Sequence, residues 1–125
     1  MNVLIVDKLS AEVVTALEKL GLQVEVRNDM DVATLPGAVG LTDILVVRST
    51  KVVAATIQAA PRLSLVIRAG AGVDTIDLTA ASERGIYVAN CPGRNTAAVA
   101  ELAIGLLVAA DRRIVDATAA MRNGV

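Results

Sequence analysis

The sequence predicts an α/β fold in which helices cover a five-stranded parallel sheet and a long C-terminal helix follows. Short runs of Val, Ile and Leu alternate with segments whose apolar residues recur at helical spacing, a pattern typical of right-handed βαβ crossovers. The 125 residues are 54% hydrophobic but include one Tyr and no Phe or Trp. The core must therefore be aliphatic, as it is in buried parallel sheets.

The first part of the chain predicts two strands joined by a helix. Residues 2–7 form a continuous apolar run that ends in an acid, typical of a strand buried on both faces. Ser10 can cap the next helix through its hydroxyl, and Gly21 supplies a left-handed stop. Residues 22–27 alternate apolar and polar side chains, which predicts a strand near the sheet edge.

The middle of the chain predicts the remaining three strands and two helices. Residues 28–41 form a loop with at most a turn or two of helix, because Asp, Pro and Gly interrupt the pattern. The strands are expected at 43–48, 63–68 and 86–89, and the helices at 52–60, before Pro61, and at 77–84, before Gly85.

Residues 96–122 predict one helix of 27 residues, roughly 40 Å long. Its apolar residues occupy much of the circumference, so it needs partners on more than one side. We expect a domain at residues 1–94 and an interdomain helix at 95–125. The helix is expected to bury against a second copy, giving a homodimer, or to fold back across the sheet. The hinge at Pro92 and Gly93 would also allow an exchanged helix.

Composition excludes several classes of function. Twelve basic and 13 acidic residues give a net charge of −1, so no overall field attracts nucleic acid or an anionic membrane. The apolar runs are too short to span a bilayer and no signal segment precedes the first strand, which favours the cytoplasm. Cys91 is the single cysteine, which excludes an internal disulfide. No histidine is present to act as an imidazole acid or base.

Two arginines end consecutive apolar strands. Arg48 and Arg68 are therefore expected on one rim of the sheet, either reaching into solvent or binding an anion through bidentate hydrogen bonds. Ser49 adds a hydroxyl donor, whereas Lys51 is expected to be merely solvated. Because arginine suits phosphate and carboxylate groups, the sequence favours anion binding over mere solvent exposure.

The loop Gly70-Ala71-Gly72 is not a dinucleotide fingerprint, because Thr75 stands where a third glycine would be needed. It is either a plain strand-to-helix turn or a loop whose amides face a ligand. Asn95 starts the long helix as an N-cap, a role that does not exclude ligand contact.

Several segments resemble the D-isomer-specific 2-hydroxyacid dehydrogenases, in order and along essentially the whole chain. Within that family the similarity is greatest to the members that oxidise 3-phosphoglycerate on the way to serine. This chain departs from the family in having one residue fewer after Ser49 and Val53 where Thr or Ser is common. The segments are Asp7-Lys8-Leu9-Ser10, VRSTKV at 47–52, RAGAGVD at 68–74, ERGI at 83–86, NCPGRN at 90–95 and VAEL at 99–102.

The resemblance implies a flavodoxin-like, doubly wound sheet of order 2-1-3-4-5 that serves as a substrate-binding domain. Arg48, Ser49 and Arg68 would hold the anionic substrate, and the amides of residues 70–72 its carboxylate. Asn95 would lie at the substrate cleft between domains.

In the intact enzyme the resemblance places Ala71 close to the nicotinamide of NAD, with the catalytic residues following Val125. We therefore expect a fragment without catalytic residues, bound metal or bound cofactor of its own, and without turnover. One alternative is a flavodoxin-like scaffold that has no ligand. Another is a receiver-like module in which Asp7 helps to hold Mg²⁺, but that module needs a phosphorylatable aspartate where Arg48 stands.

Overall fold

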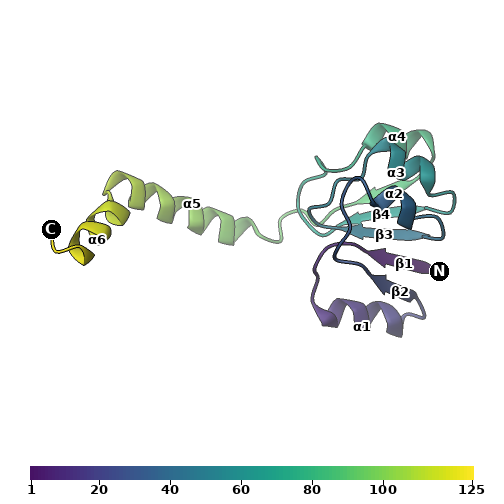
Figure 1. Cartoon of the computed structure of the whole chain (residues 1–125), viewed down its shortest axis with the longest axis horizontal. Coiled ribbons are helices and arrows are strands. Elements are labelled where there is room, and N and C mark those ends of the chain that lie inside the picture. Colours follow the sequence, from purple (N-terminus) through teal and green to yellow (C-terminus); the bar gives the residue numbers. More distant parts are fainter. The chain divides into compact units, whose positions relative to one another are not determined.

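The computed structural model describes all 125 residues, which form two compact units, Met1–Pro92 and Gly93–Val125. The first unit contains a parallel sheet of order β2-β1-β3-β4-β5 (Figure 1). The expected α/β class and strand order are thereby confirmed. The strands are β1 (Asn2–Ile5), β2 (Gln23–Val26), β3 (Ile44–Val47), β4 (Leu65–Arg68) and β5 (Tyr87–Ala89).

Helices cover both faces of this sheet, so the unit is doubly wound (Figure 1). One face carries α1 (Ala11–Lys19), and the other carries α2 (Leu35–Ala38), α3 (Ala54–Ala59) and α4 (Leu78–Glu83). The short α2 lies in the segment for which a turn or two of helix was expected.

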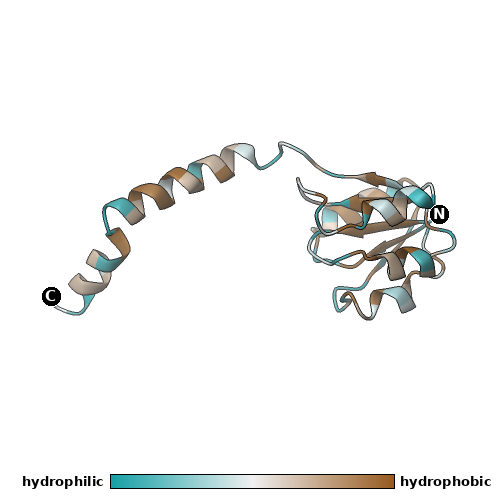
Figure 2. Ribbon diagram, turned by 90° about the horizontal axis from the view of Figure 1, so that it is seen from above, coloured by the Kyte–Doolittle hydropathy of each residue, from teal (hydrophilic) through white to brown (hydrophobic).

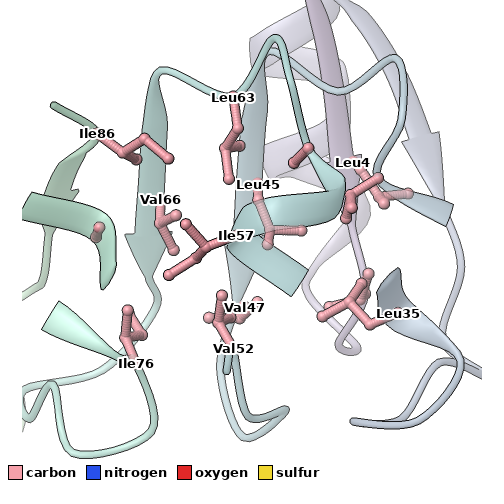
Figure 3. Close-up of a cluster of buried hydrophobic side chains, with 14 residues drawn as sticks. Leu4, Leu35, Leu45, Val47, Val52, Ile57, Leu63, Val66, Ile76 and Ile86 are labelled. Carbon is pink, nitrogen blue, oxygen red and sulfur yellow. The ribbon is translucent and has the colours of Figure 1, made fainter. Parts of the chain in front are cut away.

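The core is aliphatic and has two parts, because successive side chains of a strand point to opposite faces. Val3 and Ile5 of β1 pack on the α1 side, whereas Leu4 lies in the larger cluster beneath α2, α3 and α4. Figure 3 shows Ile57 of α3 close to the centre of that larger cluster, and its side chain is fully buried.

The structure corrects the expected cap of one helix and the expected start of another. Ser10 occupies the N-cap of α1, but its hydroxyl makes no capping hydrogen bond; only its backbone carbonyl accepts, from the Val13 amide at 3.1 Å. The helix expected from residue 52 begins instead at Ala54, because Val52 is used elsewhere. Its amide donates to the Thr75 carbonyl at 2.8 Å, and the pairing forms an isolated parallel bridge.

The second unit contains α5 (Thr96–Asp111) and α6 (Ile114–Arg122), so the expectation of one continuous helix over 96–122 was wrong. Arg113 breaks it by adopting a left-handed conformation, with φ 49° and ψ 40°. The break falls at the charged run Asp111-Arg112-Arg113. Arg113 Nε pairs with Asp116 Oδ2 at 3.2 Å, in the first turn of α6.

Figure 2 shows apolar residues along α5, and none of them is buried. Neither α5 nor any other helix combines the length and the apolar character needed to cross a membrane. The large hydrophobic residues of the second unit that are more than 45% exposed are Val99, Leu102, Ile104, Leu106, Leu107, Val108, Ile114, Val115, Met121 and Val125.

Candidate anion-binding site

The carboxyl ends of β1, β3 and β4 form one edge of the sheet, and three charged residues gather there. Asp7 follows β1, Arg48 follows β3 and Arg68 ends β4. In the register of the sheet Val47 pairs with Arg68, and the Ala69 amide donates to the Val47 carbonyl at 2.7 Å. The two arginines therefore leave neighbouring strands at the same rim, which is where ligands bind in open α/β sheets.

Asp7 binds the turn that follows β3. Its Oδ2 accepts hydrogen bonds from the amides of Arg48 at 2.7 Å, Ser49 at 3.0 Å and Thr50 at 3.1 Å. Partial burial of Asp7 acts to raise the pKa of its carboxyl, but these amide hydrogen bonds outweigh that effect and lower the pKa. The carboxylate is ionised at neutral pH and is engaged with backbone.

This engagement speaks against the receiver-like interpretation of Asp7. Nowhere in the chain do three His, Cys, Asp or Glu side chains come together in a way that could hold a metal ion.

The two rim arginines differ in their surroundings. Arg68 is folded onto the protein: Nε donates to the Arg48 carbonyl at 3.2 Å, Nη1 pairs with Asp74 Oδ1 at 3.0 Å, and only 16% of the side chain is exposed. The solvent-reaching interpretation is wrong for Arg68. The Arg48 guanidinium is exposed and has no hydrogen bond or ion pair within the chain. Of the two rim arginines, Arg48 is therefore the one that is free to meet a ligand.

The glycine loop after β4 is shaped around Arg68. A Cβ added at Gly72 would lie 2.6 Å from Arg68 Nη1 and 2.7 Å from Asp74 Oδ1, so a side chain there would disturb the ion pair. Two residues that follow β5 also hold this loop. Asn90 Nδ2 donates to the Ala71 carbonyl at 2.7 Å, and the Cys91 amide donates to the Gly70 carbonyl at 2.9 Å. The amides of residues 70–72 donate no hydrogen bond within the chain, which leaves them available.

The sequence-derived site residues are thus divided between the two units. Arg48 and Ser49 lie in the turn after β3, and Arg68 with residues 70–72 at the end of β4 and in the following loop. Asn95 belongs to the second unit, where it is the N-cap residue of α5. Its side chain makes no capping hydrogen bond; its carbonyl accepts from the Val99 amide at 2.9 Å.

Sequence reasoning missed the roles of two carboxylates at this rim. From the sequence, Asp7 is a candidate metal ligand rather than an acceptor for the turn after β3. Asp74 stands in a motif, with no indication that it is the partner of Arg68. The strand order carries a signal for Asp7, because the order 2-1-3 makes the ends of β1 and β3 neighbours.

The chain is similar to known proteins along nearly its whole length. Residues 3–124 match the family described as D-isomer specific 2-hydroxyacid dehydrogenase, catalytic domain. The D-3-phosphoglycerate dehydrogenase of Archaeoglobus fulgidus is 46% identical over 125 residues, which cover 99% of this chain and 24% of that protein. The chain therefore spans about a quarter of the length of the curated relatives it matches.

Two solved structures extend the comparison. A protein of Thermus thermophilus superposes with a TM-score of 0.89 at 35% identity, covering 99% of this chain and 41% of that one. A cofactor (NAD⁺)-bound 3-phosphoglycerate dehydrogenase of Entamoeba histolytica superposes with a TM-score of 0.78 at 30% identity, covering 87% and 38%.

Proposed function

The chain belongs to the D-isomer specific 2-hydroxyacid dehydrogenase family, and we propose that its rim binds 3-phosphoglycerate in an enzyme that oxidises this substrate to 3-phosphohydroxypyruvate with NAD. The observation that carries the proposal is the pairing of a partner-free guanidinium, Arg48, with the unused amides of the adjacent glycine loop. Both belong to the segments that carry the family resemblance. The substrate is chosen because the A. fulgidus relative, 46% identical, is described as acting on phosphoglycerate.

Arg48 and Ser49 provide the first anion contacts in this proposal, because a guanidinium and a hydroxyl suit phosphate or carboxylate oxygens. Two N–H groups of Arg68 donate hydrogen bonds to protein partners. Its remaining donors and its positive charge are left for the ligand. The amides of residues 70–72 receive the carboxylate. Asn95, at the start of α5, adds an amide side chain from the second unit.

NAD accepts the hydride when it is bound, and the chain's own residues fit a supporting part of its site. Ala71 is exposed and its neighbours are glycines, so a flat ring can approach this loop closely. We propose that Ala71 borders the nicotinamide. We propose that none of these residues is the proton acceptor, because the chain has no histidine. The 125-residue chain is therefore expected to bind substrate without turnover.

The second unit is proposed to pair with the same unit of another copy. Val99, Leu102 and Leu106 follow one side of α5, while Ile104 and Leu107 lie on others, and all are more than half exposed. A helix that is apolar on several sides needs more than one partner surface, and a second copy can offer both its α5 and its α6. Light scattering coupled to size exclusion tests this, with a concentration-independent monomer as the contradicting result.

The binding proposal is tested by titrating 3-phosphoglycerate into the chain while recording amide chemical shifts. Binding in the millimolar range is expected, because a rim on one unit leaves much of the ligand in water. Removing Arg48 with Arg48→Ala should weaken binding about tenfold or more, since hydrogen bonds to charged groups contribute ~1.5–3 kcal/mol.

The matched control is Lys19→Ala, which also removes one exposed positive charge. Lys19 lies in the last turn of α1, which returns the chain to the opposite, amino-terminal edge of the parallel sheet. Equal affinity of wild type and Arg48→Ala would contradict the proposed site. A wild-type chain that shows no shifts at all would favour the ligand-free scaffold.

A further inference from the structure

The backbone of Arg48 is held on both sides by opposite charges. Asp7 Oδ2 accepts from its amide at 2.7 Å, and Arg68 Nε donates to its carbonyl at 3.2 Å. The Arg48 side chain has no such contacts and remains exposed. The charges thus fix the backbone from which the free guanidinium extends.

We propose that Asp7 is a positioning residue for anion binding: its carboxylate sets the path of residues 48–50 and so the place of the Arg48 and Ser49 side chains. This assignment rests on the proposed function, since it deepens the description of the same rim. It concerns a residue that need not touch the ligand.

Apart from the hydrogen bonds to Asp7, few contacts fix the backbone path of residues 48–50. It begins at Val47, the last residue of β3, and ends at Val52, which is fixed by the isolated bridge to Ile76. Between these points three successive amides converge on one oxygen of Asp7. Hydrogen bonds to an ionised acceptor are about twice as strong as neutral ones, so the carboxylate dominates the conformation of the turn.

The network continues into the glycine loop through Arg68. Its Nη1 pairs with Asp74 Oδ1 at 3.0 Å while its Nε holds the Arg48 carbonyl. The ends of β1, β3 and β4 are thereby joined in the order Asp7, Arg48 backbone, Arg68, Asp74. The turn after β3 and the loop after β4, which supply the two halves of the proposed site, are set relative to each other by this series of contacts.

The test uses Asp7→Asn, which keeps the shape of the side chain but makes the acceptor neutral. We expect 3-phosphoglycerate to bind about threefold to tenfold more weakly, because a positioning residue acts through Arg48 and Ser49 and the net contribution of a hydrogen bond is about 0.5–1.5 kcal/mol. The amide resonances of residues 48–50 should move and their hydrogen exchange should accelerate, while those of β5 stay unchanged.

Asp43→Asn is the matched control for a merely structural role. Asp43 also accepts a backbone amide, that of Asn2 at 2.7 Å, but it precedes β3 and so lies at the opposite edge of the sheet. This variant should lower the unfolding midpoint and leave the dissociation constant of 3-phosphoglycerate within about twofold, since distant sites act independently.

The outcomes separate the two proposals. Wild-type affinity in Asp7→Asn, or unchanged exchange at residues 48–50, overturns the positioning role. Equal losses of affinity in Asp7→Asn and Asp43→Asn overturn it too, because general destabilisation would then explain both. If the wild-type chain does not bind 3-phosphoglycerate, the proposed function fails, whereas the hold of Asp7 on the turn is still decided by the exchange rates.

Discussion

Val52 and Ile76 join the two rim loops through the backbone and through the core. The Val52 amide donates to the Thr75 carbonyl at 2.8 Å, and the Asp77 amide donates to the Val52 carbonyl at 2.9 Å. Both apolar side chains are buried, at 0% and 6% exposure, and Figure 3 shows them in the cluster that surrounds Ile57. The bridge therefore supports the rim independently of its charged contacts.

Ile76→Ala should destabilise the first unit by about 2–4 kcal/mol, because it leaves a cavity in the larger core cluster. Urea denaturation followed by circular dichroism measures the loss. Leu41→Ala removes the same number of carbon atoms from a side chain of the first unit that is 71% exposed, so a change within ~0.5 kcal/mol is expected. Equal losses from both variants would contradict the assignment of Ile76 to the core.

Gly72→Ala should displace the Arg68–Asp74 ion pair while costing little stability. The added Cβ would approach the far ends of two side chains, which can move aside. We expect weaker binding of 3-phosphoglycerate and altered resonances of the Arg68 guanidinium. Gly37→Ala is the control, because nothing lies within 4 Å of a Cβ there. If Gly72→Ala bound the ligand like wild type, the Arg68–Asp74 pair would be irrelevant to the site.

Thr56→Val should stabilise the chain by about 0.5–1.5 kcal/mol. Thr56 belongs to α3, and its hydroxyl is fully buried and has no hydrogen-bond partner, so a methyl group of similar size avoids the cost of desolvating it. The measurement is the urea midpoint. Thr15→Val on the exposed surface of α1 should shift that midpoint far less, and a destabilised Thr56→Val would show that the hydroxyl has a partner in solution.

Acid should destabilise the first unit through Asp43. The hydrogen bond from the Asn2 amide lowers the pKa of Asp43 below its ordinary value of 3.8, and Arg62 adds to this despite the opposing effect of desolvation. A lowered pKa in the folded state gives stability that is complete above 3.8 and is lost as the pH falls through the folded-state pKa. Asp7 contributes with the same sign, since its pKa is also lowered.

Urea midpoints measured between about pH 6 and about pH 2.5 should therefore fall toward the acid end. Asp43→Asn should flatten that fall, because it removes a carboxyl whose pKa is lowered in the folded state. A midpoint that stays constant in wild type down to about pH 2.5 would contradict the role of these carboxylates.

The strands were predictable because β1, β3 and β4 are buried and their apolar runs are continuous. The start of α3 was not, because the pattern around Val52 suits a helix as well as a strand, and only its pairing with Ile76 decides between them. The break at Arg113 could not be predicted from the sequence either. A left-handed arginine carries no signal in hydrophobic spacing, which runs through the break without interruption.

At the rim, the residue types were readable but their contacts were not. The sequence places Arg48 and Arg68 at neighbouring strand ends and treats them alike. The structure distinguishes them, because Asp74 and the Arg48 carbonyl occupy one guanidinium and leave the other free. Such a difference depends on side-chain direction and on the space left by Gly72, neither of which a linear pattern records.

Tyr87 lies on β5, is 77% exposed and is the only aromatic residue of the chain. It pairs in the register with Leu65 of β4, on a part of the sheet that α1 does not cover. The chain absorbs little at 280 nm, and all of its intrinsic fluorescence comes from this one side chain. Its emission is consequently a label-free optical reporter for whatever comes to cover the β4–β5 surface.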